Sequence, residues 1–430
     1  MTKSVGIAIL GMGVVGSGVA RALSQKSDSL SSQIGADVDL KLVLVRDKSK
    51  PRSFDISKNL FSDNFDEILE RSDVDIVVEV MGGEHPALEF ILSALESGKH
   101  VVTANKEVMA KHGPDIFAAA REKGVRVLFE ASVAGGTPVV SPLMRDLVAN
   151  EVISIKAIIN GTTNYILTRM SLEQIDYDTV LKDAQDLGYA EPDPTNDVEG
   201  IDAAYKLAIL STLGFRAQVK DSDVFCEGIT KLNSKDFQYA DELGYAIKLL
   251  AISSRTNGEV QARVHPALIE KDQMLAKVDG VLNAIEIETD LTGRVLFHGP
   301  GAGSMPTSSA IVADIINIGR NIAGNAAYLD PVRLSESIKV QSISDLQTKY
   351  YFRLEAKDEP GVLAQIGSAL ADNRISISSF IQKGFDPKQG TAELVIMTHR
   401  ATERSVQLAL KDIKDLDVVA GIGNMIRVAE

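Results

Sequence analysis

The chain has 430 residues, 45% of them hydrophobic and 24% charged, which is enough for two to four globular domains with substantial cores. Its net charge of −14 argues against nucleic acid and against an anionic membrane surface as general partners. A single cysteine, Cys226, permits no intrachain disulfide, no apolar run reaches the ~18 residues that span a bilayer, and no secretory leader opens the sequence, so we expect a cytoplasmic protein.

The first third of the chain alternates short β-rich runs with amphipathic stretches. The expected strands are residues 5–10, 40–45, 75–80, 101–104 and 125–130, and the clearest helices are 86–96 and 107–122. Continuous apolar strands separated by helices are typical of a parallel sheet covered on both faces. Residues 1–131 are therefore predicted to form a doubly wound α/β domain of the Rossmann type.

The middle of the chain has a different pattern. Strands are expected at residues 153–159, 260–264 and 284–289, several helices lie between them, and a Gly-, Ser- and Pro-rich segment follows at 298–307. This mixture indicates an α+β substrate domain over residues 132–325. Its last helix, near 308–320, is expected to pack back on the first domain.

The C-terminal part begins with a predicted linker at residues 326–348. Beyond it, strands are expected at 350–356, 375–382, 392–398 and 424–428, and helices at 362–372 and 405–414. The order βαββαβ is the ferredoxin-like pattern. Residues 349–430 are predicted to form this third domain.

The motif GMGVVG at residues 11–16 follows the first strand and opens a helix. Gly11 permits the tight turn, Gly13 allows close approach to a pyrophosphate, and Gly16 permits close packing of the helix on the strand. Val14 and Val15 begin the helix, whose N-terminus favours phosphate. In this setting the motif predicts a dinucleotide site.

The end of the second strand bears on the choice of cofactor. Arg46 follows Val45, and a cation there suits the 2′-phosphate of NADPH, whereas an acid would bind the ribose of NADH. Asp47 could be such an acid displaced by one position, and Arg46 could be a simple surface charge. We favour NADPH and leave NADH open.

Three further stretches have compositions that core packing does not explain. Lys106 ends the run TANK (103–106) at the carboxyl edge of the parallel sheet, where ligands of such sheets bind. The loop GYAEPDPTND (188–197) carries three carboxylates, including Glu191 and Asp197, which suits an ammonium group, although a solvated acidic turn is an equal alternative. In DAAYK (202–206), Asp202 and Lys206 share one face of an apolar helix, which suits acid–base chemistry better than a surface ion pair.

These motifs together resemble the homoserine dehydrogenase family. The resemblance covers roughly residues 5–320 and also includes EASVAGGTP (130–138), NGTTNYIL (160–167) and GPGAGSMPT (299–307), in the family's order. It implies the reduction of aspartate 4-semialdehyde to homoserine with an NAD(P)H cofactor. It also implies a homo-oligomer, either a dimer or a tetramer.

The resemblance assigns roles residue by residue. It makes Lys206 the proton donor with Asp202 beside it, Glu191 and Asp197 the substrate-binding acids, and Lys106 a residue between substrate and cofactor. It places a monovalent cation, sodium in most of the family, at Glu130, Val133, Gly135 and Thr137, a donor set of one carboxylate and mainly main-chain oxygens. Gly303 is expected to contact the cofactor.

Two alternatives of other classes are weighed against this enzyme. A thiol-dependent aldehyde dehydrogenase needs a cysteine nucleophile, but Cys226 lies in none of these motifs and is interpreted as a packing residue. A catalytically silent sensor of the same fold is disfavoured because Lys106, Asp202 and Lys206 are all present.

The C-terminal segments KDEPGVL (357–363) and NRISI (373–377) resemble the ACT domain family. That resemblance implies an amino-acid effector, with threonine expected, at Gly361 and Asn373. Main-chain N–H groups at the Gly361 turn suit a carboxylate. A domain used only for assembly is the alternative.

Overall fold

The computed structural model describes residues 4–324, 338–386 and 390–429, so most of the predicted linker lies outside the described residues. The chain divides into two compact units. The first comprises Met1–Ile155, Tyr205–Val224 and Leu282–Lys339, and the second comprises Lys156–Ala204, Phe225–Val281 and Val340–Glu430. The predicted domain boundaries at 131, 325 and 348 stay a prediction.

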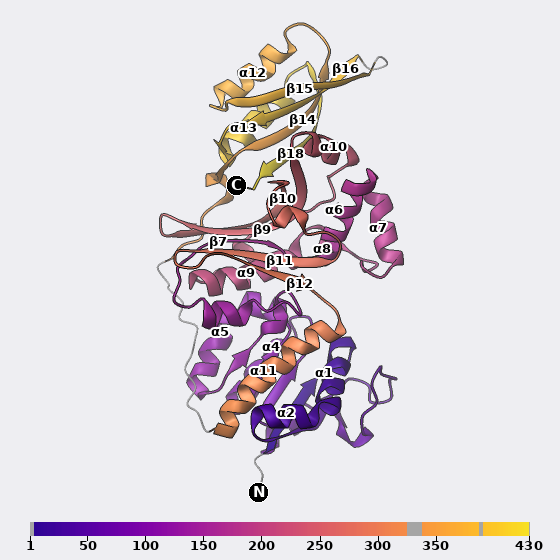
Figure 1. Ribbon diagram of the computed structural model, residues 1–430, viewed down its shortest axis with the longest axis vertical. Helices are drawn as coiled ribbons and strands as arrows, with labels where there is room; N and C mark the ends of the chain where they lie inside the picture. The colour runs from indigo at the N-terminus through magenta and orange to yellow at the C-terminus, as the bar shows by residue number, and fades with distance from the viewer. Residues whose placement is uncertain (1–3, 325–337, 387–389, 430) are drawn as a thin grey trace. The chain divides into compact units, whose positions relative to one another are not determined.

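The first unit is built on a six-stranded sheet in the order β3-β2-β1-β4-β5-β6 (Figure 1). All its pairings are parallel. The strands are β1 Ser4–Leu10, β2 Asp37–Leu44, β3 Phe61–Ser62, β4 Ile76–Glu79, β5 His100–Thr103 and β6 Val127–Leu128. The predicted doubly wound α/β sheet is confirmed, although the strand expected at 125–130 is shorter because the chain enters a 3-10 turn at Glu130.

Helices cover this sheet. They are α1 Val14–Gln25, α2 Ser27–Ile34, α3 Asp66–Glu70, α4 Ala87–Glu96, α5 Lys106–Lys123 and α11 Ser304–Gly324. The late helix α11 lies beside α1 (Figure 1), and its Ile311, Ile315 and Ile318 are buried in the same core as Val19 and Leu23 of α1. Their spacing puts these isoleucines on one helix face, so α11 completes the apolar layer over the sheet.

The second unit contains a run of strands in the order β9-β10-β18-β14-β16-β15. Their bounds are β9 Tyr245–Thr256, β10 Glu259–Glu270, β14 Tyr350–Lys357, β15 Ile377–Asp386, β16 Thr391–Thr398 and β18 Val419–Val428. With α12 Val362–Asp372 and α13 Glu403–Lys414, the last four strands confirm the βαββαβ order. Strand β18 also pairs in parallel with β10, with Ala267 opposite Arg427, so the C-terminal sheet continues into the preceding part of the chain.

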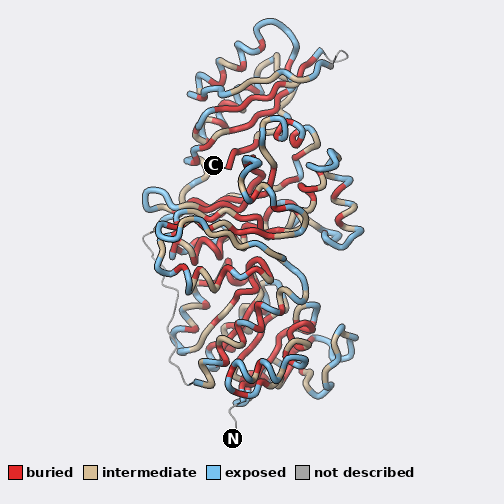
Figure 2. The backbone as a smooth tube through the Cα atoms, viewed as in Figure 1, coloured by how far each residue is buried: buried red, intermediate tan, exposed pale blue. Residues whose placement is uncertain are grey.

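Alternation along β14 explains how the C-terminal sheet is covered. Tyr350, Phe352, Leu354 and Ala356 belong to one core cluster with apolar residues of α12 and α13, such as Ile366. The intervening residues point to the other face, and β14 is buried over most of its length (Figure 2).

The remaining elements of the chain include helices that carry the candidate site. They are β7 Val152–Ile158, α6 Gly161–Glu173, α7 Tyr177–Asp186, α8 Thr195–Val198, α9 Ile201–Phe215, β8 Phe225–Cys226, α10 Ser234–Glu242, β11 Leu282–Thr289, β12 Gly293–Pro300 and the short pair β13 Gln347–Thr348 and β17 Ala401–Thr402. Within the described ranges, none of the helices combines the length and the apolar character needed to cross a membrane.

Candidate active site

The glycine turn between β1 and α1 has the geometry of a phosphate-binding turn. Gly11 has a φ of 100°, which a side chain would strain. A Cβ on Gly16 would lie 2.1 Å from the Gly11 carbonyl oxygen, so the helix can pack this closely only with glycine there. Gly13 caps α1, and a Cβ there would meet no atom within 4 Å. Open space therefore faces the positive end of α1, which fits a pyrophosphate.

The residues after β2 differ in what their side chains do. Arg46 is exposed to solvent. The Asp47 carboxylate accepts hydrogen bonds from the main-chain N and the hydroxyl of Ser49, at 2.8 and 2.6 Å, and these bonds lower its pKa. Asp47 is thus occupied in a local turn, which makes Arg46 the better placed of the two for a ligand.

A cavity of about 360 Å³ lies in the first unit next to the glycine turn. Its lining combines the start of α1, the segments that follow β4 and β5, and the two predicted lysines; it includes Val15, Met81, Gly82, Gly83, Asn105, Lys106, Ala134, Gly135, Lys206, Gly301, Ala302 and Thr307. Lys106 is the first residue of α5, and Lys206 lies on α9. Both predicted cationic groups therefore line one cavity at the carboxyl edge of the parallel sheet.

A buried carboxyl group, Glu79, shapes one wall of this cavity. It accepts from the Thr103 hydroxyl at 2.6 Å and from the main-chain N of Met81 at 2.7 Å, and burial raises its pKa. Asn105 continues the wall by donating to the Gly83 carbonyl at 2.8 Å. Glu79 is not among the site residues predicted from sequence, although an acid within an otherwise apolar strand is a usable signal.

The second unit holds the acidic loop, and Asn160 organises it. The Asn160 amide donates to Asp197 at 2.7 Å and to Asp202 at 2.9 Å. Its carbonyl oxygen also caps α6 by accepting from the main-chain N of Thr163 at 2.9 Å. Asp202 is buried and Asp197 is partly exposed. One asparagine thus fixes two predicted site carboxylates, a role that the sequence analysis did not assign.

The other acids of the loop have different environments. Asp193 accepts from the Thr195 hydroxyl at 2.6 Å and so forms a local turn. The Glu191 side chain is exposed. Thr162 donates to the Tyr189 carbonyl at 2.7 Å and thereby ties this segment to α6. Of these two acids, Glu191 has the carboxylate better placed for a ligand.

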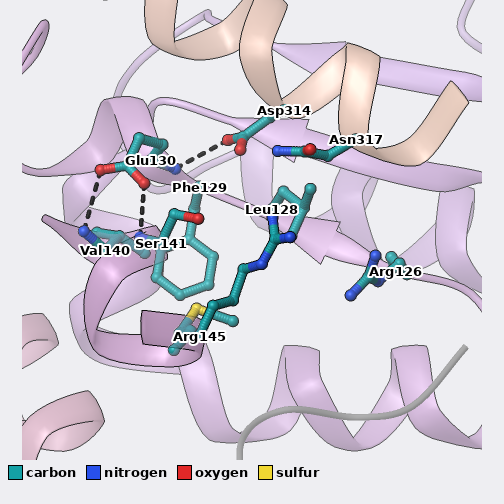
Figure 3. A pocket seen from close by; sticks show the side chains of 10 residues that line it. Arg126, Leu128, Phe129, Glu130, Val140, Ser141, Arg145, Asp314 and Asn317 are labelled. Atoms are coloured by element: carbon teal, nitrogen blue, oxygen red, sulfur yellow. Dashed lines mark hydrogen bonds between the residues drawn. The ribbon is translucent and has the colours of Figure 1, made fainter. Parts of the chain in front are cut away.

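Glu130, the one carboxylate among the predicted cation residues, is buried close to a second carboxyl group, Asp314, in the first unit (Figure 3). Glu130 accepts from the main-chain N of Val139, Val140 and Ser141, at 2.7, 3.0 and 2.6 Å. Asp314 of α11 accepts from the Glu130 main-chain N at 2.9 Å, and burial raises the pKa of Asp314 to about 8. The Glu130 carboxylate is thus already an anchor for the following turn.

Three other predicted residues sit beside this anchor. Val133 and Thr137 are buried, and Gly135 has a φ of 50°. A Cβ on Gly135 would lie 2.6 Å from the Gly301 carbonyl oxygen. Gly303, directly before α11, has a φ of 119°, so both glycines allow a backbone path that a side chain would strain.

The predicted effector residues lie at opposite ends of α12. Gly361 is its N-cap, with a φ of 94° and open space around it. Asn373 is its C-cap and donates to Ala369 and to the Asp412 carboxylate, at 2.9 and 2.8 Å. An eleven-residue helix spans about 16 Å, so one small amino acid cannot contact both residues of one chain.

Comparisons with known proteins agree with this architecture. Three family models match: homoserine dehydrogenase at residues 138–316, its NAD-binding domain at 11–130, and the ACT domain at 350–418. A homoserine dehydrogenase from Neisseria gonorrhoeae is 43% identical over 431 residues, and one from Bacillus subtilis is 38% identical over 430 residues. These alignments cover 99% of this chain and 99% and 98% of those proteins.

Solved structures give the same result. The crystal structure of a homoserine dehydrogenase from Thiobacillus denitrificans has a TM-score of 0.92 and 39% identity, with 100% of both chains covered. A hyperthermophilic archaeal homoserine dehydrogenase in complex with NADPH has a TM-score of 0.62 and 28% identity, covering 73% of this chain and 97% of that one.

Proposed function

The chain belongs to the homoserine dehydrogenase family, and from that premise we propose that it reduces L-aspartate 4-semialdehyde to L-homoserine with Lys206 as the proton donor. The observation that supports this role is the presence of Lys106 and Lys206 in one cavity beside the glycine turn. A test is the oxidation of NADPH on addition of aspartate semialdehyde, with homoserine identified as the product. A silent sensor of the same fold would bind the cofactor and give no homoserine.

The two lysines have complementary tasks. The nicotinamide cofactor, when bound, supplies a hydride to the aldehyde carbon. Negative charge then grows on the aldehyde oxygen, where the Lys106 ammonium stabilises it and the Lys206 ammonium delivers a proton from Nζ. Desolvation raises the pKa of Cys226 to about 11, so its sulfur stays a thiol, which argues against thiolate chemistry.

Substrate recognition follows from the acidic loop. Glu191 and Asp197 bind the ammonium group of the substrate, and Asn160 holds Asp197 in place through its amide. Asp202, held by the same amide, sits one helical turn before Lys206 on α9 and orients it. Asp193 is not assigned a substrate contact, because its carboxylate accepts a hydrogen bond from Thr195 within a local turn.

NADPH is proposed as the preferred nicotinamide cofactor. Gly11, Gly13 and Gly16 shape the turn, Val14 and Val15 begin the helix, and Arg46 binds the 2′-phosphate. Exposure of Arg46 and occupation of Asp47 by Ser49 both favour this choice over NADH.

A monovalent cation, sodium, is proposed at Glu130, Val133, Gly135 and Thr137. The donor set suits a hard, weakly charged ion. Because three N–H groups already use much of the Glu130 carboxylate, main-chain oxygens would supply most of the coordination. The ion would stabilise the turn beside the cavity. Thermal unfolding of wild type and Glu130→Gln in sodium chloride and in choline chloride tests this.

Regulation is proposed to come from threonine at the Gly361 end of α12. Support comes from the left-handed turn, which leaves open space before the helix N-terminus. Asn373 is a weaker candidate than Gly361, because its amide already donates to the Ala369 carbonyl at the end of the helix. Assembly into a dimer or tetramer and a cytoplasmic location complete the proposal.

A further inference from the structure

Arg427, on the last strand β18, is a buried cation with partners on α13 and on the segment that contains β8. Its guanidinium makes a two-pronged ion pair with Glu403 of α13, at 2.9 and 2.6 Å, and a third bond to Glu227 at 2.6 Å. It also lies 5.1 Å from the centre of the Phe225 ring. The Arg427 side chain is only 3% exposed, so its two carboxylate partners determine where it sits.

The Glu227 segment in turn grips the acidic loop. The main-chain N of Ile229 donates to the Val198 carbonyl at 2.8 Å, and the Cys226 thiol donates to the Glu199 carbonyl at 3.1 Å. A Cβ on Gly228 would lie 2.4 Å from the same Val198 oxygen, so the two segments touch backbone to backbone. This contact immediately follows Asp197 in the chain.

We propose that the Arg427–Glu227 ion pair positions the substrate loop, so that the C-terminal domain takes part in substrate binding. Glu403 holds Arg427, Arg427 holds Glu227, and the residues on either side of Glu227 bind the Val198 and Glu199 carbonyls. On the opposite side the Asn160 amide holds Asp197. The inference rests on the proposed role of Asp197 in binding substrate, and it makes Arg427 a positioning residue.

A second buried arginine in the same sheet offers a matched comparison. Arg353 of β14 pairs with Asp236 at 2.7 Å and with Glu393 at 3.2 Å, so it too has one partner to lose and one to keep. Its side chain is 9% exposed. Asp236 lies on α10, and Glu393 also pairs with Lys235 of α10 at 3.2 Å. The ion pairs of Arg353 therefore connect β14 to α10 and not to the loop that carries Asp197.

The experiment compares Glu227→Gln with Glu393→Gln in the full-length chain. Glu227→Gln keeps the Arg427–Glu403 pair and weakens only the hold on the loop. We expect the KM for aspartate semialdehyde to rise on the order of tenfold, kcat to change less than about twofold, and the KM for NADPH to stay the same. Glu393→Gln should lower the melting temperature comparably and leave all three constants near wild type. Arg427→Lys, which retains the charge, should raise the KM less than Arg427→Gln.

The Asp197→Asn variant tests the proposed substrate contact of Asp197 separately from the proposed positioning role of Arg427. A raised KM in Asp197→Asn together with an unchanged KM in Glu227→Gln overturns the positioning role alone. Equal KM changes in Glu227→Gln and Glu393→Gln also overturn it, because they would reflect general destabilisation. An unchanged KM in Asp197→Asn overturns the substrate assignment and this inference with it.

Discussion

A substitution of Asn160 tests the arrangement of the acidic loop directly, because its amide bridges two carboxylates. Asn160→Asp preserves the size of the side chain and the oxygen that caps α6, but it replaces the donating NH2 with an oxygen and so places a third carboxylate beside Asp197 and Asp202. The two bonds to Asp197 and Asp202, at 2.7 and 2.9 Å, become repulsive contacts. Hydrogen bonds to charged groups contribute about 1.5–3 kcal/mol each. If about 3 kcal/mol of this total affects the substrate complex, kcat/KM falls on the order of a hundredfold.

The assay is steady-state reduction of aspartate semialdehyde, together with NADPH binding, which should not change. Asn233→Asp is the matched control, since Asn233 caps α10 in the same way by accepting from the main-chain N of Asp236 at 3.3 Å. An aspartate at a helix N-terminus suits the dipole, so this variant should stay near wild type. Near-normal kcat/KM in folded Asn160→Asp would refute the bridging role.

Three further substitutions test other parts of the molecule. Arg46→Ala should raise the KM for NADPH far more than that for NADH; equal changes would mean that the side chain does not meet the 2′-phosphate. Burial, followed by the charge of Arg126, lowers the pKa of His100 to about 4 from its ordinary 6.5. Between pH 6.5 and about 4, the His100 imidazole is protonated in the unfolded chain but neutral in the folded one. The free energy of unfolding therefore decreases by about 3 kcal/mol as the pH falls through this range. His100→Asn should flatten the pH dependence of the melting temperature there, and an unchanged slope would contradict the assignment. Threonine should inhibit homoserine formation, and Gly361→Asp should abolish inhibition while basal activity remains. Deletion after Asp345 should also abolish inhibition, but because it removes Arg427 and Glu403 it should raise the KM for aspartate semialdehyde. Inhibition that persists in both folded variants would put the effector site elsewhere.

Local sequence signals predicted the elements whose geometry is local. The Gly11 turn and the close packing at Gly16 follow from spacing after a strand, and the bounds predicted for α12, residues 362–372, match the structure. The segment 298–307 is rich in Gly, Ser and Pro, yet β12 extends to Pro300 because it pairs with β11 as far as Leu282. Pairing with a partner strand therefore overrode the local composition.

The contacts that were missed are those between residues far apart in sequence. Asn160 reaches residues about forty positions later, and Arg427 meets Glu227 across 200 positions. A single sequence does not predict such long-range pairs, because polar and charged residues most often lie exposed on the protein surface. The pairing of β18 with both β10 and β14 brings Arg427 into the interior.

We propose that Lys206 delivers the proton that completes the reduction of the aldehyde. The most direct test is the kcat of Lys206→Ala for homoserine formation, measured on folded protein with its NADPH dissociation constant determined in parallel. We expect kcat to fall by roughly a hundredfold or more while the dissociation constant barely changes. Near-normal turnover would exclude Lys206 as the proton donor.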